Sequence, residues 1–356
     1  KKKIQNFGFD VIELDHGQAY SLGNKKKITI YAADACDPQL CYKFLGCANF
    51  KTKKSNHIDS LAVIENKNYK ILNLNDCPYQ LAKKTLNLVK KKHKNISLLL
   101  LGYGGAGPYP QCFDNLNTRE KKIESEKKKI KFLEDAKKYI DFIKPQFYLP
   151  FAGTYTLGGK LGKYQNLRGV PTIEEAFKFL ENNIEKKISK PLKLNIDSFY
   201  DFDKKIFSKK FIQFKKNEEI KYIKNNLSKK KFTYNKVKMP SKKDLKKLVH
   251  LAFDNYLKKT QLLNFSVQRD IVVKSRKIIF KISPKNRKII FLSNFDKKKN
   301  NNYLMHTIDT KLLYCLLKGP KHAHWNNAEI GSHIKFYRKP DVFDRDLHAS
   351  MCYFHC

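Results

Sequence analysis

The sequence lacks the features of a membrane protein or a secreted protein. Its longest apolar run, residues 96–101, is much shorter than a membrane span and is typical of a buried strand. Three lysines open the chain with no apolar segment behind them, so we expect no signal peptide and no membrane partner. The eight cysteines do not have the spacing of a secreted disulfide framework, which favours a reducing, cytoplasmic location.

Arginine is scarce in a chain that carries a formal net charge of +40. Only seven of its 73 basic residues are arginine, whereas recognition of phosphates and base edges favours the bidentate guanidinium. An excess of Lys, Asn and Ile instead indicates the bias of an AT-rich genome and a solvated lysine coat. We therefore expect no nucleic-acid partner despite the charge. A basic nucleic-acid-processing enzyme is the alternative.

Compact metal motifs are also missing. Cys36, Cys41 and Cys47 form a C-x4-C-x5-C pattern that matches no compact zinc site and predicts buried thiols. Cys352 and His355 form one C-x-x-H, but the C-x-H half of a Rieske site does not occur. We expect no Rieske cluster within these residues.

The length and the composition predict a globular protein of two domains. The chain has 356 residues, of which 41% are hydrophobic and 13% aromatic. Strands are predicted at residues 11–14, 28–31, 61–64, 69–72, 96–101 and 146–149. Helical patterns lie between the later strands, one from Pro78 and one from Asn117, where Glu120 completes a capping box. This β-α-β-α-β order is characteristic of a layered α/β domain.

The second predicted helix has a regular pattern of apolar and charged residues. Its buried stripe is expected to consist of Ile123, Ile130, Leu133, Ile140 and Ile143. Glu124–Lys128 and Glu134–Lys138 are expected to form i,i+4 ion pairs on its surface.

Aromatic residues and lysines alternate between residues 198 and 234. Such a pattern could supply a stacking platform for single-stranded nucleic acid. The preferred interpretation is that the aromatic side chains face a core and the lysines face solvent.

Three sequence motifs each consist of an apolar run, typical of a strand, that ends in a polar or glycine-rich segment. They are Tyr69-Lys-Ile-Leu-Asn-Leu-Asn-Asp-Cys77, Gly104-Gly-Ala-Gly-Pro-Tyr-Pro-Gln-Cys-Phe113 and Lys144-Pro-Gln-Phe-Tyr-Leu-Pro-Phe-Ala-Gly153. In order and spacing they resemble the metallo-β-lactamase-like part of CMP-N-acetylneuraminate hydroxylases, and most closely the bacterial relatives found with surface-carbohydrate genes. Residues 324–333 and 338–340 resemble the C-terminal domain of those relatives.

The resemblance implies a fold and a division into domains. Residues 1–168 would be the C-terminal part of a metallo-β-lactamase-like αββα sandwich, an α/β fold, and residues 169–356 a smaller α+β domain. In that fold a metal lies at the strand tips.

The resemblance also implies the site residues. Asp76 would be a metal-bridging carboxylate, although an Asp before Pro78 is equally explained as a helix cap. The glycine-rich loop would bring backbone N–H groups to an anion such as a nucleotide phosphate, although a tight strand-to-helix turn also explains it. The expected substrate-binding residues are Gly104, Gly105, Ala106, Gly107, Tyr109, Phe151, Gly153 and Tyr155. Phe151-Ala-Gly153 replaces the last metal-binding His of many hydrolases in the superfamily, which disfavours an ordinary binuclear hydrolase.

The main metal motif of the superfamily, H-x-H-x-D-H, does not occur in the sequence. Most ligands of the implied divalent metal, zinc or iron, are therefore expected upstream, and the chain is interpreted as the C-terminal portion of a longer protein. His16, His57 and His93 are predicted to be surface or turn residues. His322, His324 and His333 are predicted to be structural.

The resemblance implies a metal-dependent enzyme that acts on a small-molecule substrate, a sugar nucleotide or a surface-glycan precursor. An oxygenase would need an electron-transfer partner, because no Rieske donor is expected here. The alternatives are a metallo-β-lactamase-fold hydrolase and a non-catalytic carbohydrate- or nucleotide-binding remnant.

Overall fold

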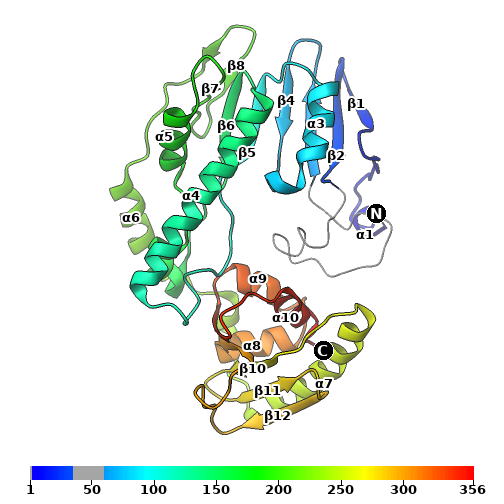
Figure 1. Cartoon of the computed structure of the whole chain (residues 1–356), viewed down its shortest axis with the longest axis vertical. Coiled ribbons are helices and arrows are strands. Elements are labelled where there is room, and N and C mark those ends of the chain that lie inside the picture. The colour runs from blue at the N-terminus through cyan, green and yellow to red at the C-terminus, as the bar shows by residue number, and fades with distance from the viewer. Residues whose placement is uncertain (1, 35–59) are drawn as a thin grey trace.

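The computed structural model describes residues 2–34 and 60–356 and shows a mixed α/β protein (Figure 1). A seven-stranded sheet and its helices form the upper part of Figure 1, and a five-stranded sheet with its own helices forms the lower part. Cys36, Cys41, Cys47 and His57 lie outside the described residues.

The larger sheet has its strands in sequence order. They are β1 (Ala19–Gly23), β2 (Lys26–Ala32), β3 (Ser60–Glu65), β4 (Lys70–Asn73), β5 (Leu98–Gly102), β6 (Phe147–Ala152) and β7 (Lys190–Pro191). The first four pair antiparallel, and β4 to β7 pair parallel. The predicted strands at 28–31, 61–64, 69–72, 96–101 and 146–149 are confirmed. The strand predicted at 11–14 is wrong, because the partner of β2 is β1, which begins at Ala19.

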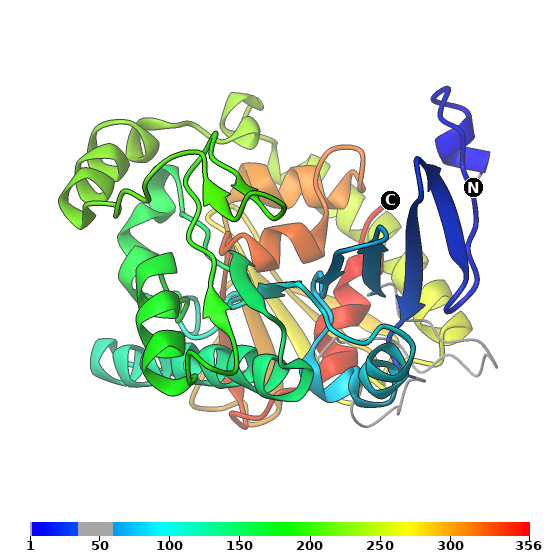
Figure 2. The same cartoon turned by 90° about the horizontal axis from the view of Figure 1, so that it is seen from above.

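Three helices connect the parallel strands: α3 (Lys83–Lys92), α4 (Thr118–Ile143) and α5 (Ile173–Asn183). Right-handed crossovers between strands in sequence order place such helices on one face of a sheet. Figure 2 shows the β1–β2 hairpin and α5 at opposite ends of the larger sheet and its helices. A short 3-10 helix at Tyr79–Leu81 precedes α3, and another spans Gly159–Leu167.

The local signal at the start of α4 is confirmed. The Asn117 side chain accepts from the Glu120 backbone N–H, and the Glu120 carboxylate accepts from the Asn117 N–H. The predicted stripe is only partly right. Leu133, Ile140 and Ile143 are buried, but Ile123 and Ile130 are about half exposed, because the N-terminal half of α4 extends beyond the sheet.

On the central strands the helix-covered face of the larger sheet is buried, whereas the opposite face is only partly buried. Along β2, β3 and β6 buried residues alternate with partly exposed ones. The partly exposed set is mostly apolar: Ser60 and Asn73 belong to it, and its apolar members include Ile28, Ile30, Ala62, Ile64, Ile71, Leu149 and Phe151. Ile64 is 37% exposed and Phe151 48%. One end of this face is covered by a small hairpin of β8 (Tyr200–Asp201) and β9 (Ile206–Phe207), where Tyr200 packs on Phe147.

The smaller sheet has the order β12-β11-β10-β13-β14. Its strands are β10 (Asp270–Lys274), β11 (Ile279–Ser283), β12 (Lys288–Leu292), β13 (Tyr303–Ile308) and β14 (Ile334–Lys339). Only β10 and β13 pair parallel. The associated helices are α7 (Lys242–Leu262), α8 (Thr310–Leu317), α9 (Trp325–Ile330) and α10 (Arg345–Ser350). Two further α-helices of the described residues, α1 (Lys2–Gln5) and α6 (Lys216–Asn225), lie outside both cores.

The segment after β5 joins the two sheets. It descends from the larger sheet in Figure 1, and Phe113 forms a parallel bridge with Phe336 of β14. The Phe336 N–H donates to the Cys112 carbonyl, and the Asp114 N–H donates to the Phe336 carbonyl. Cys112 and Phe113 are consequently part of the core of the smaller sheet.

The lysine- and aromatic-rich region matches the preferred prediction of inward-facing aromatics only in part: Tyr234 is buried, and Tyr200, Phe202 and Phe211 are partly buried. Between residues 198 and 231 no side chain is buried, and Phe199, Phe207 and Phe214 are 61%, 46% and 55% exposed. The hairpin and α6 are too small to form a core of their own.

No helix among residues 2–34 and 60–356 has the length and apolarity that crossing a bilayer requires.

Candidate functional site

The ends of β4, β5 and β6 meet at one rim of the larger sheet. A Cβ on Gly102 would lie 3.4 Å from the Ala152 carbonyl oxygen and 3.6 Å from that of Asn75. The Tyr103 N–H donates to the Ala152 carbonyl at 2.8 Å, which holds the glycine loop against the end of β6. The three motifs therefore converge in space, as expected of parallel strands.

Two of the predicted substrate-binding glycines pack against each other. A Cβ on Gly104 would lie 2.4 Å from the Gly153 carbonyl oxygen, and one on Gly153 would lie 2.8 Å from the Tyr103 ring. Both positions need glycine for this close approach of backbones. Gly105 faces the Phe132 ring, whereas a Cβ on Gly107 would meet nothing within 4 Å.

The other predicted substrate-binding residues are spread around these glycines. Ala106 is exposed. The Tyr109 hydroxyl donates to the Glu124 carboxylate at 2.7 Å, and burial together with that carboxylate raises the pKa of Tyr109. Phe151 lies on the partly exposed face of the sheet, and Tyr155 faces the loop from the segment that follows β6.

Asp76 is exposed at the rim, one residue after Asn75. It caps no helix in the structure, because the residue before the 3-10 helix is Pro78 and that before α3 is Ala82, neither with a side-chain cap. The first-turn N–H groups of α3 instead donate to Asp34, from Lys84 at 2.9 Å and Thr85 at 2.7 Å. The cap interpretation of Asp76 is therefore wrong.

The described residues do not fit the implied metal. Among residues 2–34 and 60–356, no three His, Cys, Asp or Glu side chains are grouped so that they could hold an ion. Asp76 would be a single ligand, and a protein metal site needs at least three.

A buried polar cluster lies beneath the glycine loop, between that loop, α4 and the segment after β6. We call it the Arg168 cluster, and it consists of Gln111, Ser125, Lys128, Tyr155, Gln165 and Arg168. Its two cations are adjacent: the Lys128 ammonium donates to the carbonyls of Tyr109 at 2.8 Å and Arg168 at 3.1 Å. The Arg168 guanidinium lies over the Tyr155 ring, 5.1 Å from its centroid.

The charges of this cluster are poorly compensated. Arg168 is only 6% exposed, and among the residues described its side chain forms one hydrogen bond, from Nε to the Gln165 carbonyl. Burial, and then the charge of Arg168, lowers the pKa of Lys128 to about 8. Neither cation forms an ion pair with a carboxylate in the described part of the chain.

Several neutral groups of the cluster are also without partners. Within the described residues, the buried atoms of this cluster without a hydrogen bond of normal geometry are Gln111 Oε1, Ser125 Oγ, Tyr155 Oη, Gln165 Nε2 and Arg168 Nη1, and the Tyr155 hydroxyl faces the Gly107 backbone and the Gln111 side chain. Buried polar atoms are normally paired, so their concentration here marks a place where a ligand or water belongs.

The sequence analysis missed most of this cluster. Lys128 was assigned to a surface pair with Glu124, but Glu124 pairs with Lys127 and Tyr109, and Glu134–Lys138 is replaced by Asp135–Lys138. The scarcity of arginine in the sequence was the one feature that could have pointed to Arg168. Among so few guanidinium groups, one that lies just after the third motif is a candidate for a specific role.

A second buried network runs through β2, β3 and the end of α3. Lys27 pairs with Glu65 at 2.7 Å, Glu65 with His93 Nδ1 at 2.6 Å, and His93 Nε2 with the Tyr31 hydroxyl at 2.7 Å. His93 is 3% exposed, so its prediction as a surface or turn residue is wrong. His16, by contrast, lies exposed in a turn.

Burial lowers the pKa of His93, so its ring is neutral, and Nδ1–H donates to Glu65 while Nε2 accepts from Tyr31. Burial opposes ionisation of Glu65, but the hydrogen bonds from Lys27 and His93 outweigh it and lower the pKa of Glu65. We call these four residues the Glu65 network.

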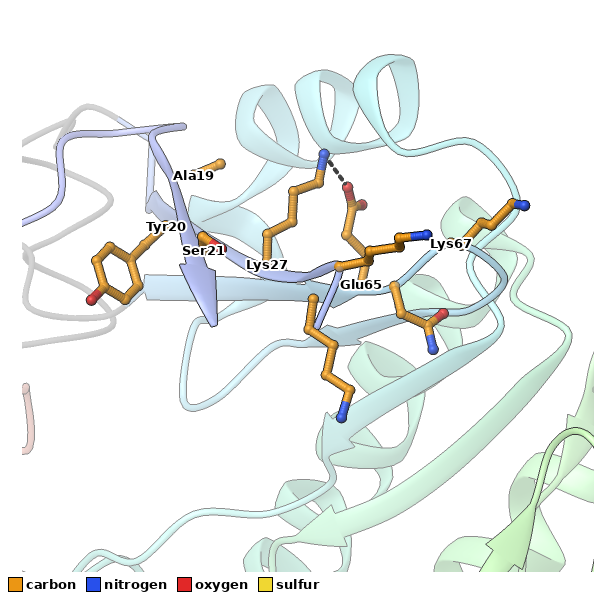
Figure 3. Close-up of a pocket in the computed structure, with 9 residues that line it drawn as sticks. Ala19, Tyr20, Ser21, Lys27, Glu65 and Lys67 are labelled. Atoms are coloured by element: carbon orange, nitrogen blue, oxygen red, sulfur yellow. Dashed lines mark ion pairs between the residues drawn. The ribbon is translucent and has the colours of Figure 1, made fainter. Parts of the chain in front are cut away.

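The Glu65 network reaches the surface in an open pocket of about 610 Å³ beside the β1–β2 hairpin (Figure 3). Lys25, Lys26, Lys27 and Lys67 line it with Glu65. Figure 3 shows the Lys27–Glu65 ion pair within the pocket. Most of its walls are long lysine side chains on the edge hairpin and on the turn after β3, which is a weak basis for a specific site.

The histidines of the smaller sheet are part of its packing. His333 packs against Phe232 and lies 3.3 Å from the Tyr234 hydroxyl. His306 is 2% exposed, and burial lowers its pKa to about 3. Its neighbour His348 pairs through Nδ1 with Glu329 at 3.0 Å.

Comparisons with known proteins identify no family. No family model and no curated protein sequence matches the chain. Two solved structures are similar over about half of it: a CmlA β-hydroxylase E377D mutant, over 54% of the chain with a TM-score of 0.32, and CmlA, a diiron β-hydroxylase from Streptomyces venezuelae, over 53% with a TM-score of 0.31. Both are 12% identical, and the match spans 34% of those chains. A TM-score at this level does not establish a shared fold.

Proposed function

We propose that this chain provides the substrate-binding side of a metal-dependent enzyme with a metallo-β-lactamase-like αββα fold, acting on a sugar nucleotide or surface-glycan precursor. The observation that supports it is the convergence of the three motifs at one rim, where Asn75, Gly102 and Ala152 are in contact. Ligands of open α/β sheets bind at this end of the strands.

The exposure of the larger sheet supports the sandwich. Three helices cover one face, while the other is mostly apolar and partly exposed, from Ile28 on β2 to Phe151 on β6. Sheets with parallel strands are normally covered on both faces. In the proposed αββα fold a second sheet packs on this apolar face.

Within this proposal the roles of the residues differ. Asp76 would contribute one carboxylate to a metal whose other ligands come from outside the described residues. The glycine loop and Tyr155 would line the substrate pocket. Gly104 and Gly153 would act only indirectly, by letting the two loops approach each other. The metal chemistry, oxygenation or hydrolysis, is assigned to none of the described side chains.

The test is metal analysis of the full-length protein. We expect near-stoichiometric zinc or iron by mass spectrometry in the wild type and most of it lost in Asp76→Ala. Asp254→Ala is the matched control, because Asp254 is an exposed aspartate on α7, in the other part of the molecule. Metal content equal in both variants contradicts a ligand role for Asp76.

A metal-free protein that still binds CMP-sugars supports the second candidate, a non-catalytic carbohydrate- or nucleotide-binding protein. Calorimetric titration with CMP and a CMP-sugar, with and without added zinc or iron, separates the two functions.

A further inference from the structure

We propose that the Arg168 cluster is a binding site for a tetrahedral oxyanion of the phosphate type, held chiefly by the Arg168 guanidinium. The ligand would lie between the glycine loop, α4 and the segment after β6. The proposal rests on the proposed function only in placing this oxyanion on a larger substrate. The site itself does not depend on a metal.

The first argument is charge. Arg168 and Lys128 are neighbouring cations in a largely buried setting, and the Lys128 ammonium donates its hydrogen bonds to neutral carbonyls. Glu175 and Glu219 act on Arg168 through space, but Glu175 is engaged with Lys129 and with the cap of α5. A buried charge without a close partner is strongly unfavourable, so an anion between these groups would be stabilised.

The chemistry of arginine strengthens this argument. A buried lysine can release its proton, and burial lowers the pKa of Lys128 to about 8. A guanidinium stays charged at any pH a protein tolerates, so Arg168 keeps its charge and its unpaired Nη1. Water can accept a hydrogen bond from Nη1, but only an anion also offsets the charge.

The second argument is the set of hydrogen-bonding groups. Arg168 Nη1 and Gln165 Nε2 are donors without partners in the described chain, and the hydroxyls of Tyr155 and Ser125 can donate as well. A tetrahedral oxyanion has several acceptor oxygens in different directions, which suits donors that come from separate elements. The Gln111 carbonyl would accept from a protonated oxygen of the ligand.

Charged groups around the site do not oppose an anion strongly. Glu124 is held by Lys127 and the Tyr109 hydroxyl. Glu174 has a buried oxygen without a partner among the described residues, but its charge acts on Tyr103, next to the glycine contact. The Arg168 guanidinium, which lies over the Tyr155 ring, is the charge that acts most strongly on the pKa of Tyr155.

The first experiment measures binding of inorganic phosphate and of CMP to the full-length protein by calorimetry at pH 7. We expect both to bind, and Arg168→Met to weaken each at least tenfold, since hydrogen bonds to charged groups are the strong ones. Arg119→Met is the control, because Arg119 is an exposed arginine in the first turn of α4. Phosphate and CMP binding unaffected by Arg168→Met, or absent in the wild type, overturns the proposal.

Comparing the affinities for inorganic phosphate and for CMP shows whether the site binds free phosphate or the phosphate of a nucleotide. Binding of phosphate that equals or exceeds that of CMP assigns a free phosphate site. Much tighter binding of CMP, lost in Arg168→Met, assigns the phosphate of a nucleotide. Either result stands if no metal is found, so failure of the proposed enzyme would not be mistaken for failure of this site.

A second variant avoids the risk that loss of Arg168 disturbs folding. Tyr155→Phe removes a hydroxyl that forms no hydrogen bond of normal geometry with the described residues. Its thermal stability should match that of Tyr148→Phe, which removes another buried, unpaired hydroxyl on β6 outside the cluster. Only Tyr155→Phe should weaken phosphate binding, by roughly three- to tenfold. Equal phosphate affinity of the two variants contradicts the proposal.

A proton-linked signature tests the position of the ligand. Because burial and Arg168 lower the pKa of Lys128 to about 8, an anion nearby should raise it and draw a proton onto the ammonium at pH 8. Sulfate is the probe, since it does not titrate there. Calorimetry in two buffers of different ionisation enthalpy should show proton uptake in the wild type and none in Lys128→Met. Binding without proton uptake in the wild type argues against a site at Lys128.

Discussion

The Glu65 network and the Arg168 cluster are both buried polar groups at the larger sheet, but they differ in completeness. Each side chain of the Glu65 network meets the next at 2.6–2.7 Å, and its lysine and glutamate neutralise each other. The Arg168 cluster has two cations and several unpaired atoms within the described chain. A complete network holds two strands and a helix together, whereas an incomplete one indicates a place for a ligand.

The largest expected effect comes from opening the complete network. Glu65→Ala should lower the free energy of unfolding by about 3 kcal/mol, because it leaves the buried Nδ1–H of His93 without its acceptor and Lys27 without its ion-pair partner. Urea denaturation at pH 7 measures it. Glu126→Ala is the control, since Glu126 forms an exposed ion pair with Lys129 and should lose less than about 0.5 kcal/mol. Equal losses would remove the distinction between a buried network and a surface pair.

The glycines of the loop provide the next test, because they separate packing from binding. Gly104→Ala should cost about 2 kcal/mol, since its Cβ would lie 2.4 Å from a backbone oxygen of Gly153. Gly107→Ala should change stability by less than about 1 kcal/mol, because its Cβ would meet nothing within 4 Å. Thermal unfolding compares the two. If Gly107→Ala is the more destabilising, the two loops do not meet as described.

Local signals predicted the elements well, and long-range contacts limited the rest. The capping box of Asn117 depends on residues three apart, so the sequence alone was enough to find it. The exposure of Ile123 and Ile130 depends on how far α4 extends past the sheet, which no periodicity encodes.

The candidate site shows the same limit. The three motifs were visible because they are contiguous in sequence. Lys128 and Arg168 are separated by 40 positions and meet only through tertiary folding. Gln111 is held in place by a long-range hydrogen bond to Ser332, which is equally invisible in the sequence. His93 was assigned to the surface because its partners, Glu65 and Tyr31, lie on other elements.

His306 is a third kind of buried polar group, because its imidazole is neutral and needs no partner of opposite charge. Acid titration tests it. The folded-state pKa of His306 is about 3, below its unfolded value, so stability should be lost as the pH falls below the unfolded pKa. At pH 5.5 the loss relative to pH 7 should be about 1 kcal/mol. His306→Phe should reduce this loss, while His322→Gln, an exposed control, should not. Identical acid curves for wild type and His306→Phe contradict a buried, neutral imidazole.

The smallest expected change in stability is that of Asp76→Asn. It tests whether the Asp76 carboxylate stabilises the fold or is free to bind a ligand. Asp76 is exposed and caps no helix, so Asp76→Asn should change the stability of metal-free protein by less than about 0.5 kcal/mol. Asp34→Ala, which removes the acceptor of the first turn of α3, should cost about 1 kcal/mol. Guanidinium denaturation of both variants checks this. A loss of that size in Asp76→Asn would mean that the carboxylate stabilises the fold itself, and the reason for considering it a free ligand would disappear.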